Sequence, residues 1–336
     1  MKKHSFIFRL LGLILLLTGM QSCIYDYPHA SRGHSPGIGE DPTTVDAYID
    51  VDFDISWESM LHNVNLDYET KAATQRPHRI IIEVLDGDMV LCHDVEYLNA
   101  NEFANGRLLH RLSVPLEAKV YQIAAWYDRQ DENGKHSFSA DDLSKIGLIN
   151  TSTTNVEDMQ CAYARDTIDL MDYGVSEEIS ITKTLSMKHS GARFEIVATD
   201  VNQFIADNRE ALFQDDKFTV HLYFSYGTSS SFNTYSESIR IEEETLHLSG
   251  RMRLPFAEYD ELKIAEGFLF CQDQDEITAK LSVTNSALVT VAQTKEFNFP
   301  VKRGYITIIS GDFLTNSVDG VFSVDNLWDD EIIIEI

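Results

Sequence analysis

Apolar and polar residues alternate along much of the chain. From Ala47 to Trp57 every second residue is apolar, and three of the residues between them are aspartates. A period of two predicts a β-strand with one face in a core and the other face in water. Similar segments predict further strands at residues 78–85, 88–95, 107–114, 118–128, 165–170, 178–187, 193–199, 217–226, 263–272, 277–284, 288–301, 305–310 and 331–336.

Two local signals refine this pattern. The dipeptide Asp86-Gly87 separates two strand segments, which is typical of a tight β-hairpin. Residues 201–213 have helical periodicity instead, and Asp200 followed by Gln203 predicts a capped helix N-terminus. Many short strands and one short helix predict an all-β protein built from sandwiches.

A polar stretch with little periodicity interrupts the strand series at residues 172–176. Such a stretch is typical of the connection between two domains. We therefore predict two β-sandwich domains, at residues 45–174 and 175–336.

The N-terminus has the pattern of an export signal. Lys2, Lys3 and Arg9 are followed by the apolar run 10–17. This run is too short for a transmembrane helix of roughly 20 residues, but it suits the hydrophobic region of a signal peptide.

Cys23 is the predicted lipid attachment site. Ser22 and Cys23 resemble a lipobox, with Met20 in place of the usual leucine, a variant common in Bacteroidetes lipoproteins. We predict a lipoprotein signal peptide at residues 1–22, a flexible tether at residues 23–44, and palmitate-type acyl chains holding the protein at the outer membrane. An ordinary signal peptide is the alternative.

The chain is strongly acidic, with a formal net charge of −27 at pH 7. This charge argues against nucleic-acid binding, which needs a basic surface. The aspartates 50, 52 and 54 stand about 7 Å apart along one strand, too far to share a calcium ion. The acidic segment 128–142 lacks the acidic residues that an EF-hand loop needs at its first and last positions. We therefore predict no metal site.

Three cysteines remain besides Cys23. Cys92, Cys161 and Cys271 are widely spaced and have no zinc-binding pattern. Cys92 and Cys271 sit in apolar runs, where a thiol behaves as a small buried hydrophobe. We predict no essential disulfide framework, with a single pair as the alternative.

No catalytic motif is found, and the sequence predicts neither an enzyme, nor a cofactor, nor a small-molecule substrate. A stand-alone glycan-binding lipoprotein is the alternative function, because exposed aromatic rings could stack on sugars. The candidate rings are Trp126, Tyr127, Tyr226, Phe232 and Tyr235, although core positions are the simpler interpretation.

The segment 297–315 is the most informative part of the mature chain. It contains Pro300-Val301, a basic pair at 302–303, an aromatic and β-branched strand at 305–309, and Gly-x-x-Leu-Thr at 311–315. This order resembles the closing motif of Bacteroidetes fimbrillin-like proteins, in particular FimB-type minor or anchor subunits. The segments 120–128, with its Trp-x-Asp, 161–170 and 185–200 resemble the same family in the same order.

The resemblance implies two tandem transthyretin-like β-sandwiches in a lipid-anchored fimbrial subunit at the bacterial surface. Subunits of that kind bind other fimbrial subunits by strand addition, in which one chain supplies a strand to the open sheet edge of its neighbour. The candidate strands here are residues 46–57 and 331–336. For residues 331–336, an edge strand of its own domain is the favoured alternative.

Overall fold

Strands dominate the structure, a computed structural model. It describes residues 44–54, 77–98, 107–117, 119–131, 134–149, 151–153, 159–172, 179–208, 217–225, 231–240, 246–252, 254, 261–315, 323–326 and 332–335. Within these residues the only helix is α4, Val201–Asp207. The predicted all-β fold class with one short helix is confirmed.

The chain divides by its internal contacts into two compact units. The smaller unit contains the described residues of 1–48, 113–120 and 169–180. Inside it, the backbone N–H of Leu170 donates to the carbonyl oxygen of Lys119 at 3.1 Å. The larger unit contains the other described residues and holds the two cores. The predicted boundary at residues 174–175 divides the sequence into two continuous domains, whereas each of these units combines several segments of the chain. The two predicted domains therefore stay a prediction.

A three-stranded sheet has the order β4-β1-β9. Its strands are β1 (Thr44–Asp54), β4 (Arg107–Glu117) and β9 (Ile179–Ser186). The strand predicted after the tether is therefore the middle strand of a sheet.

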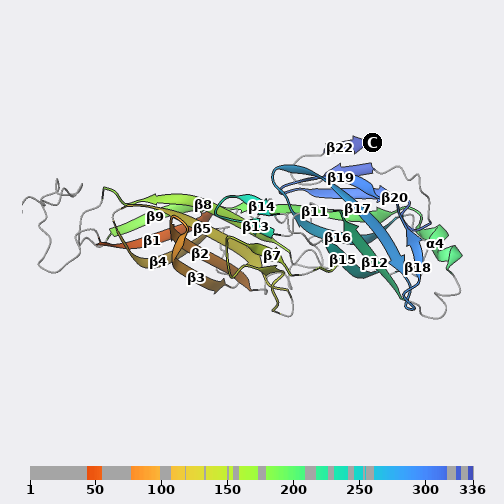
Figure 1. Ribbon diagram of the computed structural model, residues 1–336, viewed down its shortest axis with the longest axis horizontal. Helices are drawn as coiled ribbons and strands as arrows, with labels where there is room; N and C mark the ends of the chain where they lie inside the picture. Colours follow the sequence, from red (N-terminus) through yellow and green to blue (C-terminus); the bar gives the residue numbers. More distant parts are fainter. Residues whose placement is uncertain are drawn as a thin grey trace, which may run out of the picture. The chain divides into compact units, whose positions relative to one another are not determined.

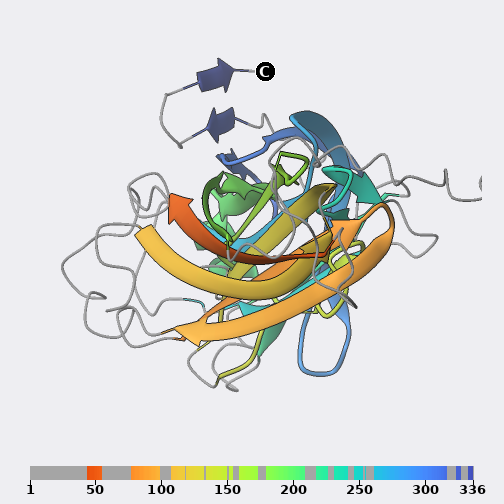
Figure 2. The ribbon, with the colours of Figure 1, turned by 90° about the vertical axis from the view of Figure 1, so that its left-hand side faces the viewer.

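A five-stranded sheet has the order β10-β8-β5-β2-β3. Its strands are β2 (His78–Asp86), β3 (Met89–Leu98), β5 (Val120–Arg129), β8 (Cys161–Asp169) and β10 (Lys188–His189). The predicted hairpin at Asp86-Gly87 joins β2 to β3, and Gly87 has the positive φ of 60° that this turn requires. Figure 2 shows the two orange strands of this hairpin as long, curved ribbons.

A small four-stranded sheet, β14-β13-β7-β6, joins segments from the two predicted domains. Its strands are β6 (Phe138–Ser139), β7 (Ile146–Leu148), β13 (Ser231–Asn233) and β14 (Ser238–Arg240). In the antiparallel pair β7–β13, Ile146 lies opposite Phe232. None of these short strands was predicted.

Two sheets form the C-terminal half, whose strands β11, β12 and β15 to β20 are drawn close together in Figure 1. One has the order β16-β11-β20-β21-β22, and the other has the order β15-β12-β17-β18, with β19 paired to β17. The strands of the first are β11 (Gly191–Ala198), β16 (Leu262–Phe270), β20 (Ile306–Gly311), β21 (Ser323–Asn326) and β22 (Ile332–Glu335). Those of the second are β12 (Phe218–Phe224), β15 (His247–Met252), β17 (Gln274–Thr284), β18 (Thr290–Gln293) and β19 (Phe297–Lys302).

The segment 151–153 connects β15 to β16. The N–H of Ser249 donates to Thr151 at 2.9 Å, and the N–H of Thr153 donates back to Ser249 at 3.2 Å. The N–H of Glu266 on β16 then donates to Thr153 at 3.0 Å. A short piece of the first predicted domain thus supplies backbone bonds to two strands of the second.

Two hydrophobic cores follow from the strand patterns. The C-terminal core lies between the two C-terminal sheets, and β12 illustrates how it forms. Phe218, Val220, Leu222 and Phe224 alternate into it as predicted, while Tyr223 is 44% exposed on the other face. The central core is built around aromatic side chains from β5, β6, β13 and β16, namely Trp126, Phe138, Phe232, Phe268 and Phe270.

The helix differs from its prediction in one respect. Val201 and Phe204 are buried, and α4 ends at Asp207, while residues 209–213 of the predicted helix lie outside the described residues. The prediction that the Asp200 side chain caps the helix is wrong, because this side chain makes no capping hydrogen bond. Its carboxylate is engaged by a segment more than a hundred residues further along the chain.

Candidate functional site

The predicted closing motif forms the end of the C-terminal sandwich. Asp200 Oδ2 accepts hydrogen bonds from the N–H groups of Leu314 and Thr315 and from the Thr315 hydroxyl, at 2.7–2.8 Å. The Thr199 hydroxyl donates to Asp312 at 2.7 Å. The Gly-x-x-Leu-Thr segment is therefore fastened to the start of α4 by charge-assisted bonds. This role is structural.

Lys302 of the basic pair is the last residue of β19, and Arg303 lies in the turn that leads to β20. Arg303 donates through Nε to the carbonyl oxygen of Gln272 at 2.6 Å and through Nη1 to the hydroxyl of Tyr163 on β8 at 2.6 Å. Lys302 places its ammonium 3.8 Å from the centre of the Tyr305 ring, a cation–π contact. Arg303 thus joins the C-terminal sandwich to β8.

The Trp-x-Asp segment of β5 holds a buried ion pair. Asp128 accepts from Arg79 Nε on β2 at 2.9 Å, forms a second contact with Arg79 Nη2, and accepts from Trp126 Nε1 at 2.9 Å. Arg79 Nη2 also donates to the carbonyl oxygen of Phe138 at 3.0 Å. The Asp128 side chain is fully buried, so this aspartate belongs to the interior and not to an acidic loop.

The aromatic residues considered for sugar binding are mostly core residues. Trp126, Tyr127 and Phe232 are fully buried, so the platform that the glycan-binding alternative needs at Trp126 and Tyr127 is absent. Tyr235 is half-buried and donates its hydroxyl to Glu83. Tyr226 lies outside the described residues.

The prediction that a thiol in an apolar run is buried is confirmed for Cys271 but not for Cys92. Cys161 and Cys271 are buried, and Cys92 on β3 is half-exposed. Burial raises the pKa of the Cys271 thiol to about 12, and it raises the pKa of Cys161 still further. Both thiols are therefore protonated and unreactive at neutral pH.

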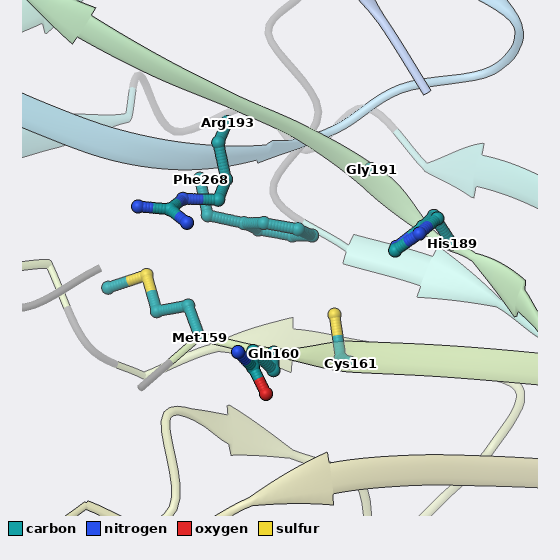
Figure 3. A pocket seen from close by; sticks show the side chains of 7 residues that line it. All are labelled: Met159, Gln160, Cys161, His189, Gly191, Arg193 and Phe268. Atoms are coloured by element: carbon teal, nitrogen blue, oxygen red, sulfur yellow. The ribbon is translucent and has the colours of Figure 1, made fainter. Parts of the chain in front are cut away.

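The small cavity in Figure 3 has a volume of about 20 Å³. Arg193 and Phe268 lie on one side of it and Met159 and Cys161 on the other, with the Cys161 sulfur pointing into the gap. A space of this size holds a water molecule and is far smaller than a ligand pocket.

The two strands considered for strand addition occupy different places. β1 lies between β4 and β9, so it is not at an edge. β22 is the outermost strand of its sheet and pairs with β21, with Ile334 opposite Val324. The favoured interpretation of residues 331–336, an edge strand of its own domain, is confirmed for Ile332–Glu335.

Strand β3 is an exposed edge that the sequence did not single out. It is the last strand of its sheet and, within the described residues, it pairs only with β2. The register of β3 with β2 shifts between Val90 and Cys92, which marks a β-bulge, and Val90 is 41% exposed. Four further apolar side chains are exposed along the strand, on both sides of the bulge: Met89 at 58%, Leu91 at 40%, Val95 at 37% and Tyr97 at 56%. We call these four residues the β3 stripe. Alternation in the sequence indicated a strand here, but could not tell that the strand would lie at the edge of its sheet.

A family model matches residues 42–336, which is nearly the whole chain beyond the predicted signal peptide and tether. Its description is "Family of unknown function (DUF6562)". The chain belongs to this family. No curated protein matches the DUF6562 chain.

Two solved structures are similar to the DUF6562 chain. The fimbrial anchor protein Mfa2 from Porphyromonas gingivalis is 11% identical, with a TM-score of 0.46, and the match covers 87% of this chain and 99% of that one. A fimbrial assembly protein from Parabacteroides distasonis is 12% identical, with a TM-score of 0.37, and the match covers 87% of this chain and 100% of that one. At these identities and TM-scores neither likeness decides a function.

The predicted lipid site of the DUF6562 chain, Cys23, lies outside the described residues, as do the predicted signal peptide and nearly all of the tether. In the part of the chain that the structure describes, no helix is both long and apolar enough to cross a membrane.

Proposed function

We propose that this chain is a lipid-anchored minor or anchor subunit of a bacterial fimbrium, non-enzymatic, which binds a shaft subunit by strand addition at the outer membrane. Cys23 is the lipid-bearing residue, and the acyl chains retain the protein at the cell surface. The closing-motif resemblance and the lipobox support this function from the sequence.

The observation that carries the proposal is the exposed edge of β3. An edge strand presents unpaired N–H and C=O groups to any incoming chain, and proteins normally protect such edges with charge, bulges or a covering element. β3 has one bulge near its start and two acidic residues, Asp94 and Glu96, but it is 10 residues long and exposes the apolar β3 stripe. An added strand would gain main-chain hydrogen bonds along the edge and apolar contacts along the stripe.

The structure assigns no such role to β1. Offering β1 to another subunit would require its removal from between β4 and β9, with loss of the hydrogen bonds to both neighbours. β3 can accept a strand without breaking any described pairing. In the proposed complex this chain is therefore the acceptor and the shaft subunit is the donor.

The test is co-purification from outer membranes. Leu91→Lys combined with Val95→Lys places two charges in the β3 stripe, and this variant should stay in the membrane fraction but lose the shaft protein. Val289→Lys is the matched control, because Val289 is also exposed, at 56%, but lies between β17 and β18. This control should keep the shaft protein. Cys23→Ala should leave the membrane fraction.

Two results would overturn the proposal separately. Undiminished recovery of the shaft protein by the stripe variant would rule out β3 as the acceptor edge. Fibres of unchanged length and attachment after deletion of the gene would rule out the fimbrial role itself.

A further inference from the structure

Two histidines on neighbouring strands meet on the outer face of the C-terminal half. His221 Nδ1 on β12 and His247 Nε2 on β15 lie 3.3 Å apart and form a hydrogen bond. Both side chains point away from the C-terminal core, because Val220 and Leu222 on either side of His221, and Leu248 next to His247, point into it. We propose that these two nitrogens hold a zinc ion.

The separation of the two nitrogens fits tetrahedral zinc. Histidine nitrogens bind Zn²⁺ at about 2.0–2.1 Å, and two such ligands at a tetrahedral angle lie about 3.3 Å apart. Neighbouring ligands of a square-planar ion would lie closer, at about 2.8 Å. The two side chains, hydrogen-bonded to each other without a metal, thus have the spacing that a tetrahedral ion requires.

Both rings are held in orientation by other groups. The Thr284 hydroxyl oxygen lies 3.0 Å from His221 Nε2. When it accepts the Nε2 proton, the lone pair of His221 is on Nδ1, facing His247. The His247 ring is stacked on Tyr223, with 4.5 Å between centroids and 2° between planes. Partners of this kind fix the tautomer and ring orientation of metal-binding histidines.

The surroundings favour a metal that prefers nitrogen. The strand register places Lys280 and His247 opposite Tyr223, and Ser249 and Ser282 opposite His221, so no carboxylate occupies these positions. Calcium and magnesium need oxygen ligands, whereas imidazole suits zinc. No group of three or more His, Cys, Asp or Glu side chains in the described residues is arranged for a metal. The zinc would therefore have two protein ligands, with water or another molecule completing the shell.

The test is a zinc titration of the full chain, produced without a polyhistidine tag, against a chromophoric zinc chelator. The wild type should bind zinc at this site with a stoichiometry of one. His221→Ala and His247→Ala should each lower the affinity for zinc by at least about tenfold, and Thr284→Val should lower it by about tenfold. The ring ¹⁵N resonances of His221 and His247 should shift when zinc is added.

His93→Ala is the matched control. His93 is another partly exposed strand histidine, and it is paired with Glu83 instead of a second histidine. Its replacement should leave the titration unchanged, and the melting temperature of the His247→Ala variant without zinc should equal that of the wild type. Equal zinc binding by the wild type and a His221→Ala/His247→Ala double variant, or unshifted ring resonances, would overturn the site. This inference does not depend on the fimbrial function.

Discussion

Replacing Asp128 with alanine removes the acceptor at the centre of the buried network between β2 and β5. Arg79, whose side chain is 6% exposed, would keep only its hydrogen bond to the Phe138 carbonyl oxygen. Trp126 Nε1 would lose its partner. A positive charge and an indole N–H would then remain in the interior with no acceptor for most of their protons.

These lost interactions determine how far the free energy of unfolding should fall. Leaving one member of a buried ion pair without its partner costs about 3–5 kcal/mol. At about 2 °C for each kcal/mol in a chain of this size, the melting temperature should fall by about 6–10 °C. Removing both charges with Arg79→Met and Asp128→Ala should recover most of this loss, because no unpaired charge remains buried.

The assay is urea and thermal unfolding followed by circular dichroism. Asp166→Ala is the control, since Asp166 pairs with Lys183 at 2.9 Å on the surface, with side chains 39% and 29% exposed. That variant should lose no more than about 1 kcal/mol. The reasoning would be refuted if Asp128→Ala cost no more than Asp166→Ala, or if the double variant were no more stable than Asp128→Ala alone.

Two further predictions concern packing and pH. A Cβ atom at Gly250 would lie 2.0 Å from the Thr153 hydroxyl oxygen, so Gly250→Ala should lower the free energy of unfolding, measured in urea, by about 1–3 kcal/mol. The control is Gly147→Ala, which should leave this free energy unchanged because nothing lies within 4 Å of the added Cβ atom. Equal effects of the two substitutions would contradict the close packing at Gly250. Burial, with a smaller contribution from the Arg129 charge, lowers the pKa of His78 to about 4 from 6.5 in the unfolded chain. Between these two pH values the unfolded state therefore binds a proton at His78 that the folded state does not bind. The free energy of unfolding should fall by up to about 3 kcal/mol as the pH is lowered from 6.5 to 4. His78→Gln should show a smaller loss between pH 7 and pH 4.5, and an equal loss would exclude this histidine as a cause.

The sequence predicted those elements whose stability depends on local pattern. The half-buried strand β12 has strict alternation, and the Asp86-Gly87 turn has residues that favour one hairpin geometry. Both are visible within a short window of the chain. The strands β7 and β13 are three residues each, and they exist because Ile146 and Phe232 pair across a long separation in sequence. No local pattern predicts such a pair.

Polar residues misled the sequence reasoning for a related reason. Asp200 stands where a helix cap belongs, but its partners, Leu314 and Thr315, are distant in sequence. Trp126 and Asp128 share one face of β5, and an aspartate in a strand normally predicts that this face is exposed to solvent. The face is buried here because Arg79, distant in sequence, neutralises the Asp128 carboxylate. The two histidines of the proposed zinc site likewise come together only through the register of β12 and β15.

The central core, to which the paired residues Ile146 of β7 and Phe232 of β13 belong, limits the order in which the protein can fold. The central core takes Trp126 and Phe138 from early in the chain and Phe268 and Phe270 from much later. During synthesis, the early strands therefore cannot complete their packing until residues near 270 have emerged. Non-local contacts of this kind slow folding and prolong the exposure of apolar surface. Such a chain depends on being kept from aggregating until its last third arrives.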